Sequence, residues 1–327
     1  MNRLVLIDGN AILHRAFHAL PPLTAPDGSV VNAVYGFVSI LIKIFNDLKP
    51  THMAVAFDRP EPTFRKSLYK DYQAKRPEMD MDLVSQIPKV QDTIRAFGIP
   101  MYDKAGFEAD DVIGTIVVKS KVKSQKSKVG SIEEIIIVTG DKDILQLVDD
   151  KRGIKVFMPT KGLSEGELFG EKDVVEKMGV TPSQIPDLKA LMGDSSDNYP
   201  GVAGIGPKTA VDLITRYGNI DKIYRTVNSK QKAEKGEVGV IEKLLKGEEN
   251  ARLSKDLATI RTDVPVVIGE LRTIQTLDTP EAREKLEEFH FPSLIKRLVG
   301  KEKEKKGDKK NQKKDTNEKQ AEQQELF

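Results

Sequence analysis

The chain has 327 residues, of which 39% are hydrophobic and 31% charged, and it contains no Cys. This composition predicts a globular protein with one or two cores, and it excludes disulfides, thiolate metal sites and a cysteine nucleophile. The four His residues are scattered, which disfavours a His-rich zinc site. No apolar run approaches membrane-spanning length and no signal peptide precedes the first strand-like run, so we expect a cytoplasmic protein without membrane contact.

The net charge of +2 arises in the C-terminal tail, where residues 301–327 contain nine Lys and seven acidic residues. The rest of the chain is therefore neutral overall. If the acidic residues discussed below hold metal ions, the remaining surface is basic, which suits a polyanionic substrate. The alternative is an ordinary charged surface.

Residues 1–182 alternate between apolar runs and amphipathic stretches. Strands are predicted at 4–7, 53–57 and 135–138, with a short strand at 99–102. Helical spacing of apolar residues predicts helices at 34–48, 79–97 and 108–118. This alternation predicts an α/β fold with a doubly wound parallel sheet, and a Lys- and Ser-rich loop is expected at 119–130.

Residues 183–298 are expected to form a second, helical region. In it, Gly204-Ile205-Gly206 makes a glycine-rich turn before a predicted helix at 209–217. With Lys208 and Thr209, such a turn exposes backbone N–H groups to a phosphate, although it could also be a simple tight turn. Residues 299–327 have almost no apolar side chains before their end and are expected to be a disordered, charged tail.

Acidic residues follow, or lie close to, the apolar runs: Asp8, Asp58, Glu108, Asp110, Asp111, Asp141, Asp143, Asp194 and Asp197. In open α/β sheets, sites form at the carboxyl ends of the strands. Carboxylates gathered there repel one another unless cations lie between them, and hard divalent cations such as Mg²⁺ take oxygen ligands of this kind. The acids therefore predict a two-metal site, which suits phosphodiester chemistry.

Each acidic cluster also has an ordinary explanation. Asp8 could cap a helix or act as the nucleophile of a phosphatase, and the acids at 108–111 could only charge a helix N-terminus. Residues 140–143 could be an Asx turn, and 193–198 a polar loop. Four clusters at four predicted element ends favour the metal site, because coincidence would have to occur four times.

The segment 60–82 is polar and mixes basic residues with aromatic ones, among them Phe64, Arg65, Tyr69 and Tyr72. Basic and aromatic side chains together suit single-stranded nucleic acid, which they bind through its charge and its bases. The alternative is an exposed loop with half-buried Tyr side chains.

With these motifs, the chain resembles the 5′→3′ exonuclease, or flap endonuclease, domain of bacterial DNA polymerase I and its stand-alone relatives. The similarity runs from residue 4 to about 298. It is carried by Leu6-Ile7-Asp8-Gly9-Asn10, Ala56-Phe57-Asp58, Glu108-Ala109-Asp110-Asp111, Thr139-Gly140-Asp141-Lys142-Asp143, Gly193-Asp194-Ser195-Ser196-Asp197-Asn198 and Gly204-Ile205-Gly206-Pro207-Lys208.

The resemblance implies a PIN-like nuclease core at 1–182, a helical arch at about 60–100, and a helical DNA-binding region at 183–298 with a helix–three-turn–helix element. All nine acids match the family's metal positions. Arg15, Arg65 and Tyr72 match positions near the scissile phosphate or in the arch. The family usually has Lys directly after the arch Tyr, whereas this chain has Gln73, with Lys75 and Arg76 nearby.

The implied function is hydrolysis of DNA and RNA primers at 5′ flaps, nicks and 5′ ends in replication and repair. It would depend on Mg²⁺, with Mn²⁺ as a substitute, and the protein would be a monomer. Gln323, Leu326 and Phe327 resemble the short peptides that dock on the bacterial sliding clamp. The alternatives are an inactive 5′-end-binding module, the nuclease fragment of a DNA polymerase I, and a ribonuclease of the related metal-nuclease class.

Overall fold

A computed structural model of the chain describes residues 1–121, 132–160, 165–229, 238–269 and 271–299. Its centre is a six-stranded sheet in the order β3-β2-β1-β4-β5-β6. The strands are β1 (Arg3–Asp8), β2 (His52–Ala56), β3 (Met101–Tyr102), β4 (Glu134–Val138), β5 (Ile154–Pro159) and β6 (Gly166–Phe169). Neighbouring strands are parallel except β5 and β6, which are antiparallel. The predicted doubly wound sheet is confirmed, with an antiparallel strand added at one edge.

Apart from the short edge strand β3, the strands found from sequence are those buried on both faces. Every residue of β2 and β4 is buried, and such strands are continuous apolar runs. In contrast, β5 alternates between buried and half-buried residues and contains Lys155, and most of β6 is exposed. These two strands therefore lack the apolar run that reveals the others, and the sequence analysis missed them.

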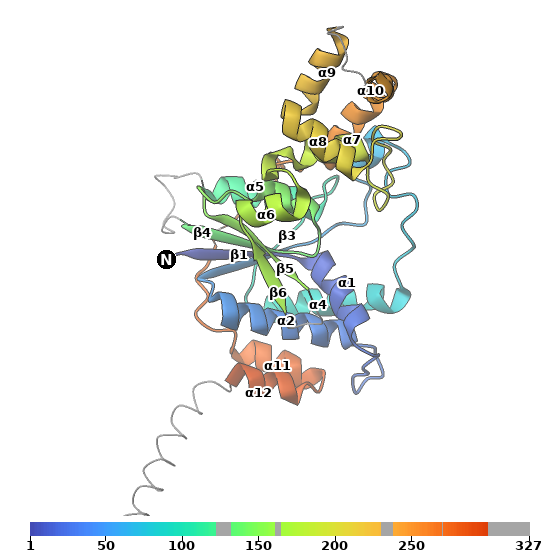
Figure 1. Cartoon of the computed structure of the whole chain (residues 1–327). Coiled ribbons are helices and arrows are strands. Elements are labelled where there is room, and N and C mark those ends of the chain that lie inside the picture. The colour runs from blue at the N-terminus through green and yellow to red at the C-terminus, as the bar shows by residue number, and fades with distance from the viewer. Residues whose placement is uncertain (122–131, 161–164, 230–237, 270, 300–327) are drawn as a thin grey trace, which may run out of the picture.

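Alternate residues of β1 enter two different cores, because successive side chains of a strand point to opposite faces. Leu4 and Leu6 pack with α5 (Ala109–Lys121). Val5 and Ile7 pack on the other face with α1 (Gly9–Ala19), α2 (Asn32–Leu48) and α4 (Met81–Ala96). Figure 1 shows these helices on the two sides of the sheet, with α6 (Glu171–Met178) beside α5. Of the helices in residues 1–182, α2, α4 and α5 were predicted, whereas α1, the short α3 (Phe64–Leu68) and α6 were not.

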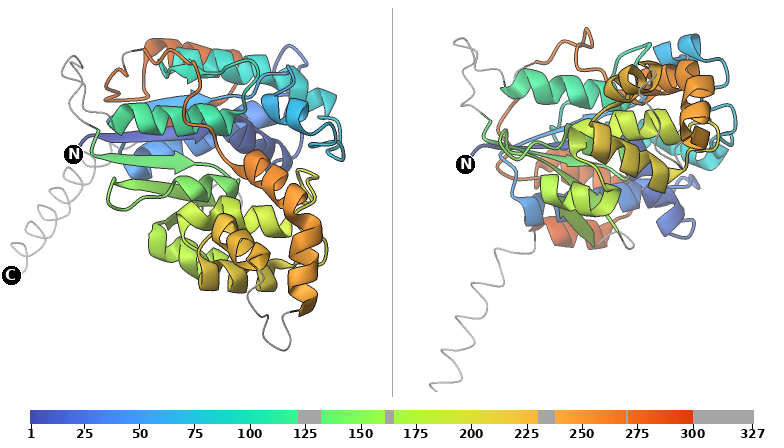
Figure 2. Two further views of the ribbon diagram at one scale, coloured as in Figure 1. Left: turned by 90° about the horizontal axis from the view of Figure 1, so that it is seen from above. Right: turned by 45° about the horizontal axis from the view of Figure 1, so that its top comes forward.

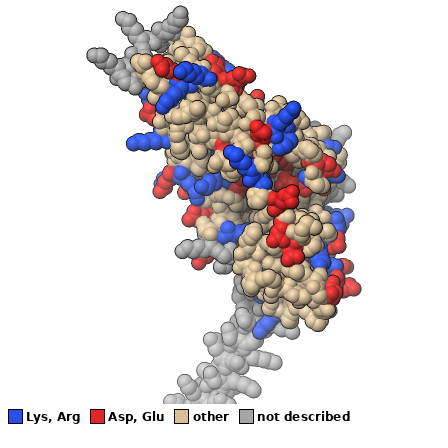
Figure 3. All heavy atoms as spheres, turned by 90° about the vertical axis from the view of Figure 1, so that its right-hand side faces the viewer, with Lys and Arg blue, Asp and Glu red and all other residues tan. Residues whose placement is uncertain are grey.

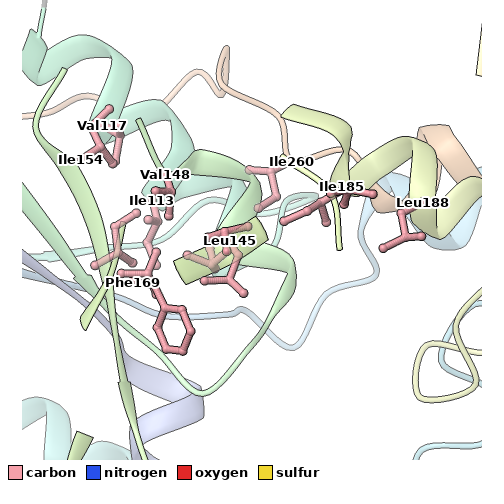
Figure 4. Close-up of a cluster of buried hydrophobic side chains, with 14 of the residues drawn as sticks. Ile113, Val117, Leu145, Val148, Ile154, Phe169, Ile185, Leu188 and Ile260 are labelled. Carbon is pink, nitrogen blue, oxygen red and sulfur yellow. The ribbon is translucent and has the colours of Figure 1, made fainter. Parts of the chain in front are cut away.

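The helical second region shares the core on the α5 side of the sheet. It contains α7 (Ile185–Met192), α8 (Pro207–Tyr217), α9 (Ile220–Asn228) and α10 (Val238–Ala258). Figure 4 shows Ile185, Leu188 and Ile260 continuing the cluster that includes Ile113 and Leu145. Within this region, α10 lies along α7 and α9 (Figure 2).

The last two helices return to the opposite face of the sheet. Leu286 of α11 (Pro280–Glu288) and Leu294 of α12 (Pro292–Val299) are buried in the core that contains α2 and α4. The predicted loop at 119–130 begins inside α5, and the rest of it lies outside the described residues, as do Gln323, Leu326 and Phe327. Among the helices that are described, none is long and apolar enough to cross a membrane.

The segment expected to form the arch, 60–100, divides into two parts. Residues 60–80 contain only the short helix α3 (Phe64–Leu68) and a series of turns. The second half of α4 belongs to the core, where Val90 and Ile94 are buried. Within the segment 60–100, therefore, only residues 60–80 and the start of α4 border the cavity described below.

The loop between α7 and α8 folds back on itself through two glycines. Asp194 and Tyr199 exchange backbone hydrogen bonds of 3.0 Å, which brings Gly193 next to Gly201. Both glycines have positive φ, at +70° and +60°, and a Cβ on Gly201 would lie 2.2 Å from the backbone nitrogen of Gly193. No larger residue fits there, so this contact fixes the loop that carries Asp194 and Asp197.

We expect Gly201→Ala to lower the free energy of unfolding by at least about 2 kcal/mol, because the new Cβ meets backbone and the φ angle is strained. Urea denaturation followed by circular dichroism measures this. The control is Gly239→Ala in α10, where a Cβ meets no atom within 4 Å and stability should be unchanged or rise by about 0.5–1 kcal/mol. Equal stability of the two variants would contradict the packing described.

Candidate active site

A cavity of about 850 Å³ lies at the carboxyl ends of β1, β2 and β4. Its acidic lining includes Asp8, Asp58, Glu108, Asp110, Asp141, Asp143 and Asp197, with Glu61, Glu78 and Asp80 also bordering it. Figure 3 shows acidic side chains inside a hollow on this face, with Lys and Arg side chains beside it. The structure thus brings together seven of the nine acids singled out from the sequence.

Two of these acids also cap helices. Asp8 Oδ1 accepts a hydrogen bond of 3.0 Å from the backbone N–H of Ala11 in α1, and its Oδ2 accepts one of 2.7 Å from the hydroxyl of Thr139. Asp58 Oδ1 accepts one of 2.7 Å from Ala109 N–H at the start of α5. Helix capping was the ordinary explanation for Asp8. Asp8 does cap α1, and it also lines the cavity. The caps fix the carboxylates at the strand ends.

Asp141 and Asp143 form the Asx turn that was the ordinary explanation for their motif. The backbone N–H of Asp143 donates a 2.8 Å hydrogen bond to Asp141 Oδ1. The backbone N–H of Asp141 in turn donates to the hydroxyl of Thr139, at 3.0 Å. Thr139 therefore positions Asp8 on β1 and the turn after β4 together.

Burial of so many like charges shifts their titration. Burial raises the pKa of Asp8 to about 7, although its hydrogen bonds from Ala11 and Thr139 oppose the shift. Burial likewise raises the pKa of Glu108 to about 7 and that of Asp143 to about 6. The pKa of Asp110 lies well above its ordinary value, because of burial and the charges of Asp141 and Asp8. These carboxylates lack sufficient countercharge from the chain itself.

This donor set fits divalent cations, which prefer carboxylate oxygens and would supply the missing countercharge. The oxygens are not yet gathered around one point: in the described ranges, no three His, Asp or Glu side chains form a group that could hold a metal ion. Several of them instead contact Arg and Lys side chains of the chain. Binding a metal would therefore require some of these contacts to rearrange.

Asp111 is one of the two acids that do not line the cavity. It forms a bidentate ion pair with Arg65, at 2.7 Å and 2.9 Å, and both side chains are buried. Asp111 also accepts hydrogen bonds from the backbone N–H groups of Glu108 and Arg261. Both of its oxygens thus already accept hydrogen bonds within the protein.

Arg65 lines the cavity, but its guanidinium donates hydrogen bonds to groups of the protein itself. Its Nε donates 2.7 Å to the carbonyl of Leu257, and Nη2 donates 3.2 Å to that of Thr259. The guanidinium also lies 4.6 Å from the centre of the Phe64 ring. The pair of Arg65 and Asp111 therefore joins α3, the start of α5 and the end of α10.

Asp194 is the second acid away from the cavity lining. Its Oδ2 is paired with Lys189, and its Oδ1 accepts hydrogen bonds of 2.7 Å and 2.6 Å from the backbone and hydroxyl of Ser196. Against the effect of burial, these bonds lower the pKa of Asp194 to about 2. Lys189 also lies 2.7 Å from Asp143 Oδ1. Sequence reasoning missed Lys189, because nothing in a helical Lys signals a buried position.

The turn at 70–76 is attached to Asp197. Arg76 Nη2 donates 2.7 Å and Gln73 Nε2 donates 3.2 Å to Asp197 Oδ1, and the backbone N–H of Gln73 donates to the Asp197 carbonyl. The hydroxyl of Tyr72 donates 3.2 Å to Glu108 Oε2, and its ring stacks on Tyr199. Burial, followed by the charges of Glu108 and Asp197, raises the pKa of Tyr72. Tyr72 is thus a buried support for the acids.

The remaining predicted site residues lie apart from the lining. Arg15 and Lys75 do not border the cavity, whereas His14 and His18, which were not singled out, do. Four residues separate these two His on α1, so they lie on the same face of the helix.

The glycine-rich turn opens α8 as expected. Gly206 is the N-cap residue of α8, Pro207 begins the helix, and Lys208 is exposed. Gly204 has a φ of +77°, and its carbonyl accepts a 3.2 Å hydrogen bond from Lys243 of α10. Thr209 is half-buried behind them. The turn therefore gains a second Lys that only the tertiary structure brings there.

The class of the protein follows from comparison with known families. Residues 3–179 match the model described as "5'-3' exonuclease, N-terminal resolvase-like domain". Residues 180–287 match the model described as "5'-3' exonuclease, C-terminal SAM fold". The fold and the acidic cavity are therefore those of a nuclease, a hydrolase.

Two relatives define the family more closely. The chain is 42% identical over 298 residues to DNA polymerase I of Caldicellulosiruptor bescii, covering 90% of this chain but only 33% of that protein. It is 34% identical to the 5′-3′ exonuclease of Aquifex aeolicus, covering 91% of this chain and 96% of the relative. The chain belongs to the 5′-3′ exonuclease family, and it spans about a third of the length of the DNA polymerase I relatives it matches.

Solved structures show the same fold at lower identity. The zinc-bound T5 5′-exonuclease is 20% identical with a TM-score of 0.62, over 91% of this chain and 98% of that chain. The catalytic core of Rad2 in complex with DNA substrate is 18% identical with a TM-score of 0.57, over 91% and 92%. The expected fold is thus confirmed.

The buried ion pair gives a stability prediction. We expect Arg65→Met to lower the free energy of unfolding by about 3–5 kcal/mol, because it leaves the Asp111 carboxylate buried without its partner. Urea denaturation of the metal-free protein measures this loss.

The matched control is Arg59→Met. Arg59 pairs with Glu61 and Asp103, but all three side chains are more than two-fifths exposed, so the loss should stay below about 1 kcal/mol. A loss at Arg65 no larger than that at Arg59 would rule out a structural ion pair.

Proposed function

We propose that the chain is a structure-specific 5′ nuclease, which hydrolyses DNA and RNA primers at 5′ flaps, nicks and 5′ ends in replication and repair. The observation that carries this proposal is the set of seven carboxylates lining one cavity at the end of the sheet. Membership of the 5′-3′ exonuclease family supports it. A cytoplasmic location is proposed because the substrate is DNA.

We propose Mg²⁺ as the cofactor, with Mn²⁺ as a substitute. The ligands would come from the acidic lining: Asp8, Asp58, Glu108, Asp110, Asp141, Asp143 and Asp197. When bound, two such ions activate a water for attack on phosphorus and stabilise the leaving oxygen. The chain's own carboxylates would hold the ions, and the helix caps of Asp8 and Asp58 would keep the ligands in place.

The arch would supply the cation for the scissile phosphate from Arg76. Arg76 and Lys66 line the cavity, whereas Gln73 is neutral and Lys75 lies outside the lining. Arg76 is about half exposed and paired with Asp197, so it can leave that partner when a phosphate enters. We therefore propose Arg76 in the role that a Lys after the arch Tyr has in the family.

Further proposals concern organisation and partners. We propose a nuclease domain at 1–182 and a DNA-binding region at 183–298, in a monomer whose tail residues Gln323, Leu326 and Phe327 dock on the sliding clamp. The chain matches about a third of the DNA polymerase I relatives, so one alternative is that it is the nuclease portion of a DNA polymerase I. The other alternative is an inactive module that binds 5′ ends, and the loss of cleavage tested next separates it from an enzyme.

The test is cleavage of a labelled 5′-flap duplex with Mg²⁺ and with EDTA. We expect Asp110→Asn to reduce turnover at least about 100-fold while flap affinity stays within about threefold, since a metal ligand is lost away from the duplex grip. Turnover within about threefold of the unsubstituted protein would contradict the metal-ligand role.

The same variant tests the electrostatics. The pKa of Asp110 is raised in the folded protein. At any pH above the ordinary pKa of an Asp side chain, the charge on Asp110 therefore lowers the free energy of unfolding. Asp110→Asn should therefore raise the melting temperature in EDTA near neutral pH, and the gain should vanish as pH falls toward 4. The control is the exposed Asp92→Asn, which should change neither quantity.

Lys208→Ala should weaken binding to flap DNA and reduce the slope of log affinity against log salt by about one, because one phosphate contact is lost. Fluorescence anisotropy at several salt concentrations measures the slope. Lys285→Ala on α11, which packs on the opposite face of the sheet, is the control and should leave it unchanged. An unchanged slope for Lys208→Ala would mean that Lys208 does not contact the DNA backbone.

A further inference from the structure

Two of the acids predicted to bind metal already share a cation that belongs to the chain. Lys189 of α7 places its ammonium nitrogen 2.7 Å from Asp143 Oδ1, and it contacts Asp194 Oδ2 even more closely. The Lys189 residue is only 8% exposed. Lys side chains are almost never buried unless they are paired, so this position depends on the two carboxylates.

The surroundings hold Lys189 in this place. Its neighbours Leu188, Ala190 and Leu191 are buried in the core, so α7 cannot rotate to release the side chain. Asp194 is fixed as well, because its second oxygen accepts both hydrogen bonds of Ser196. The contact is therefore part of the folded structure and not one orientation of a mobile surface side chain.

Asp143 connects this ion pair with the cavity. Asp143 lines the cavity, whereas Lys189 and Asp194 do not. The ammonium thus neutralises one end of the acidic cluster from behind the cavity wall. Any divalent cation that binds Asp143 from the cavity meets a positive charge on the far side of the same carboxylate, which opposes its binding.

We propose that Lys189 takes the place of a divalent cation between Asp143 and Asp194. Its charge thereby weakens binding of the more weakly held of the two divalent ions proposed for the cavity, called the second ion below. This inference rests on the proposed metal-dependent function. It makes Lys189 a positioning residue: the ammonium keeps the acidic cluster stable without metal and sets the metal concentration at which the cavity fills.

The alternative is an ion pair that only stabilises the fold. The two explanations predict different metal affinities for Lys189 variants and different effects of added metal on their stability. A purely structural ion pair would leave metal affinity unchanged when Lys189 is replaced, and added metal would not recover the lost stability. A resident cation competes with metal, so its removal would tighten metal binding and metal would restore the stability.

The experiment is isothermal titration of the full chain with Mn²⁺. We expect Lys189→Met to bind the second Mn²⁺ at least about tenfold more tightly than the unsubstituted protein. Lys189→Arg keeps the charge, and Lys255→Met removes an ammonium that pairs with Asp187 at 2.8 Å, outside the cavity lining. Both controls should stay within about threefold of the unsubstituted protein.

A second readout keeps the proposal testable if Lys189→Met folds poorly. Its melting temperature in EDTA should fall, and Mn²⁺ should recover most of the difference. Lys189→Gln, which keeps a hydrogen-bond donor without the charge, should behave in the same way. Unchanged or weaker Mn²⁺ binding by both neutral variants, or a stability deficit that Mn²⁺ does not recover, would overturn the inference. If none of the proteins bound Mn²⁺, the proposed metal chemistry would fall, and the inference with it.

Discussion

The repulsion among the carboxylates at the carboxyl ends of β1, β2 and β4 is the constraint on which the rest of the structure depends. Seven of them line one cavity, and burial makes each charge costly. Groups placed around the acids partly compensate their charges: backbone N–H donors at two helix starts, the hydroxyl of Thr139, and cationic side chains. What these groups leave uncompensated is the charge that a divalent cation would neutralise.

The cationic partners differ in how firmly they are held. Arg65 is buried and donates four hydrogen bonds, so it belongs to the framework that joins the cavity to the end of α10. Lys189 is buried but shared between two acids, one of which faces the cavity. Arg76 is about half exposed, and its guanidinium is paired with Asp197. This series of three cations, from most to least firmly held, agrees with the roles proposed for them: structural for Arg65, tuning for Lys189 and substrate contact for Arg76.

One continuous stretch of chain connects the cavity with the glycine-rich turn. The loop that follows α7 carries Asp194 and Asp197, is closed by the contact of Gly193 with Gly201, and then leads into the turn that opens α8. Because α7 shares the core of the sheet, the turn is fixed relative to the acids. If the turn binds duplex DNA as proposed, this rigidity fixes its distance from the acids.

The sequence by itself determined the central strands, the helices α2, α4, α5 and α8, and the acids that follow the strands. These features are local: an apolar run marks a buried strand, and its last residue lies at the edge of the sheet whatever surrounds it. It also located the glycine-rich turn at the start of a helix. It missed β5 and β6, because partial burial leaves a weaker apolar pattern.

Only the tertiary structure decided which acids face the cavity and which cations they meet. Asp111 and Asp110 are adjacent in sequence, yet one is enclosed by Arg65 from 46 residues away and the other faces the cavity. Lys189 looks like any helical Lys until the fold brings Asp143 to it. Charge partners depend on distances between segments remote in the chain, and no local pattern of residues encodes those distances.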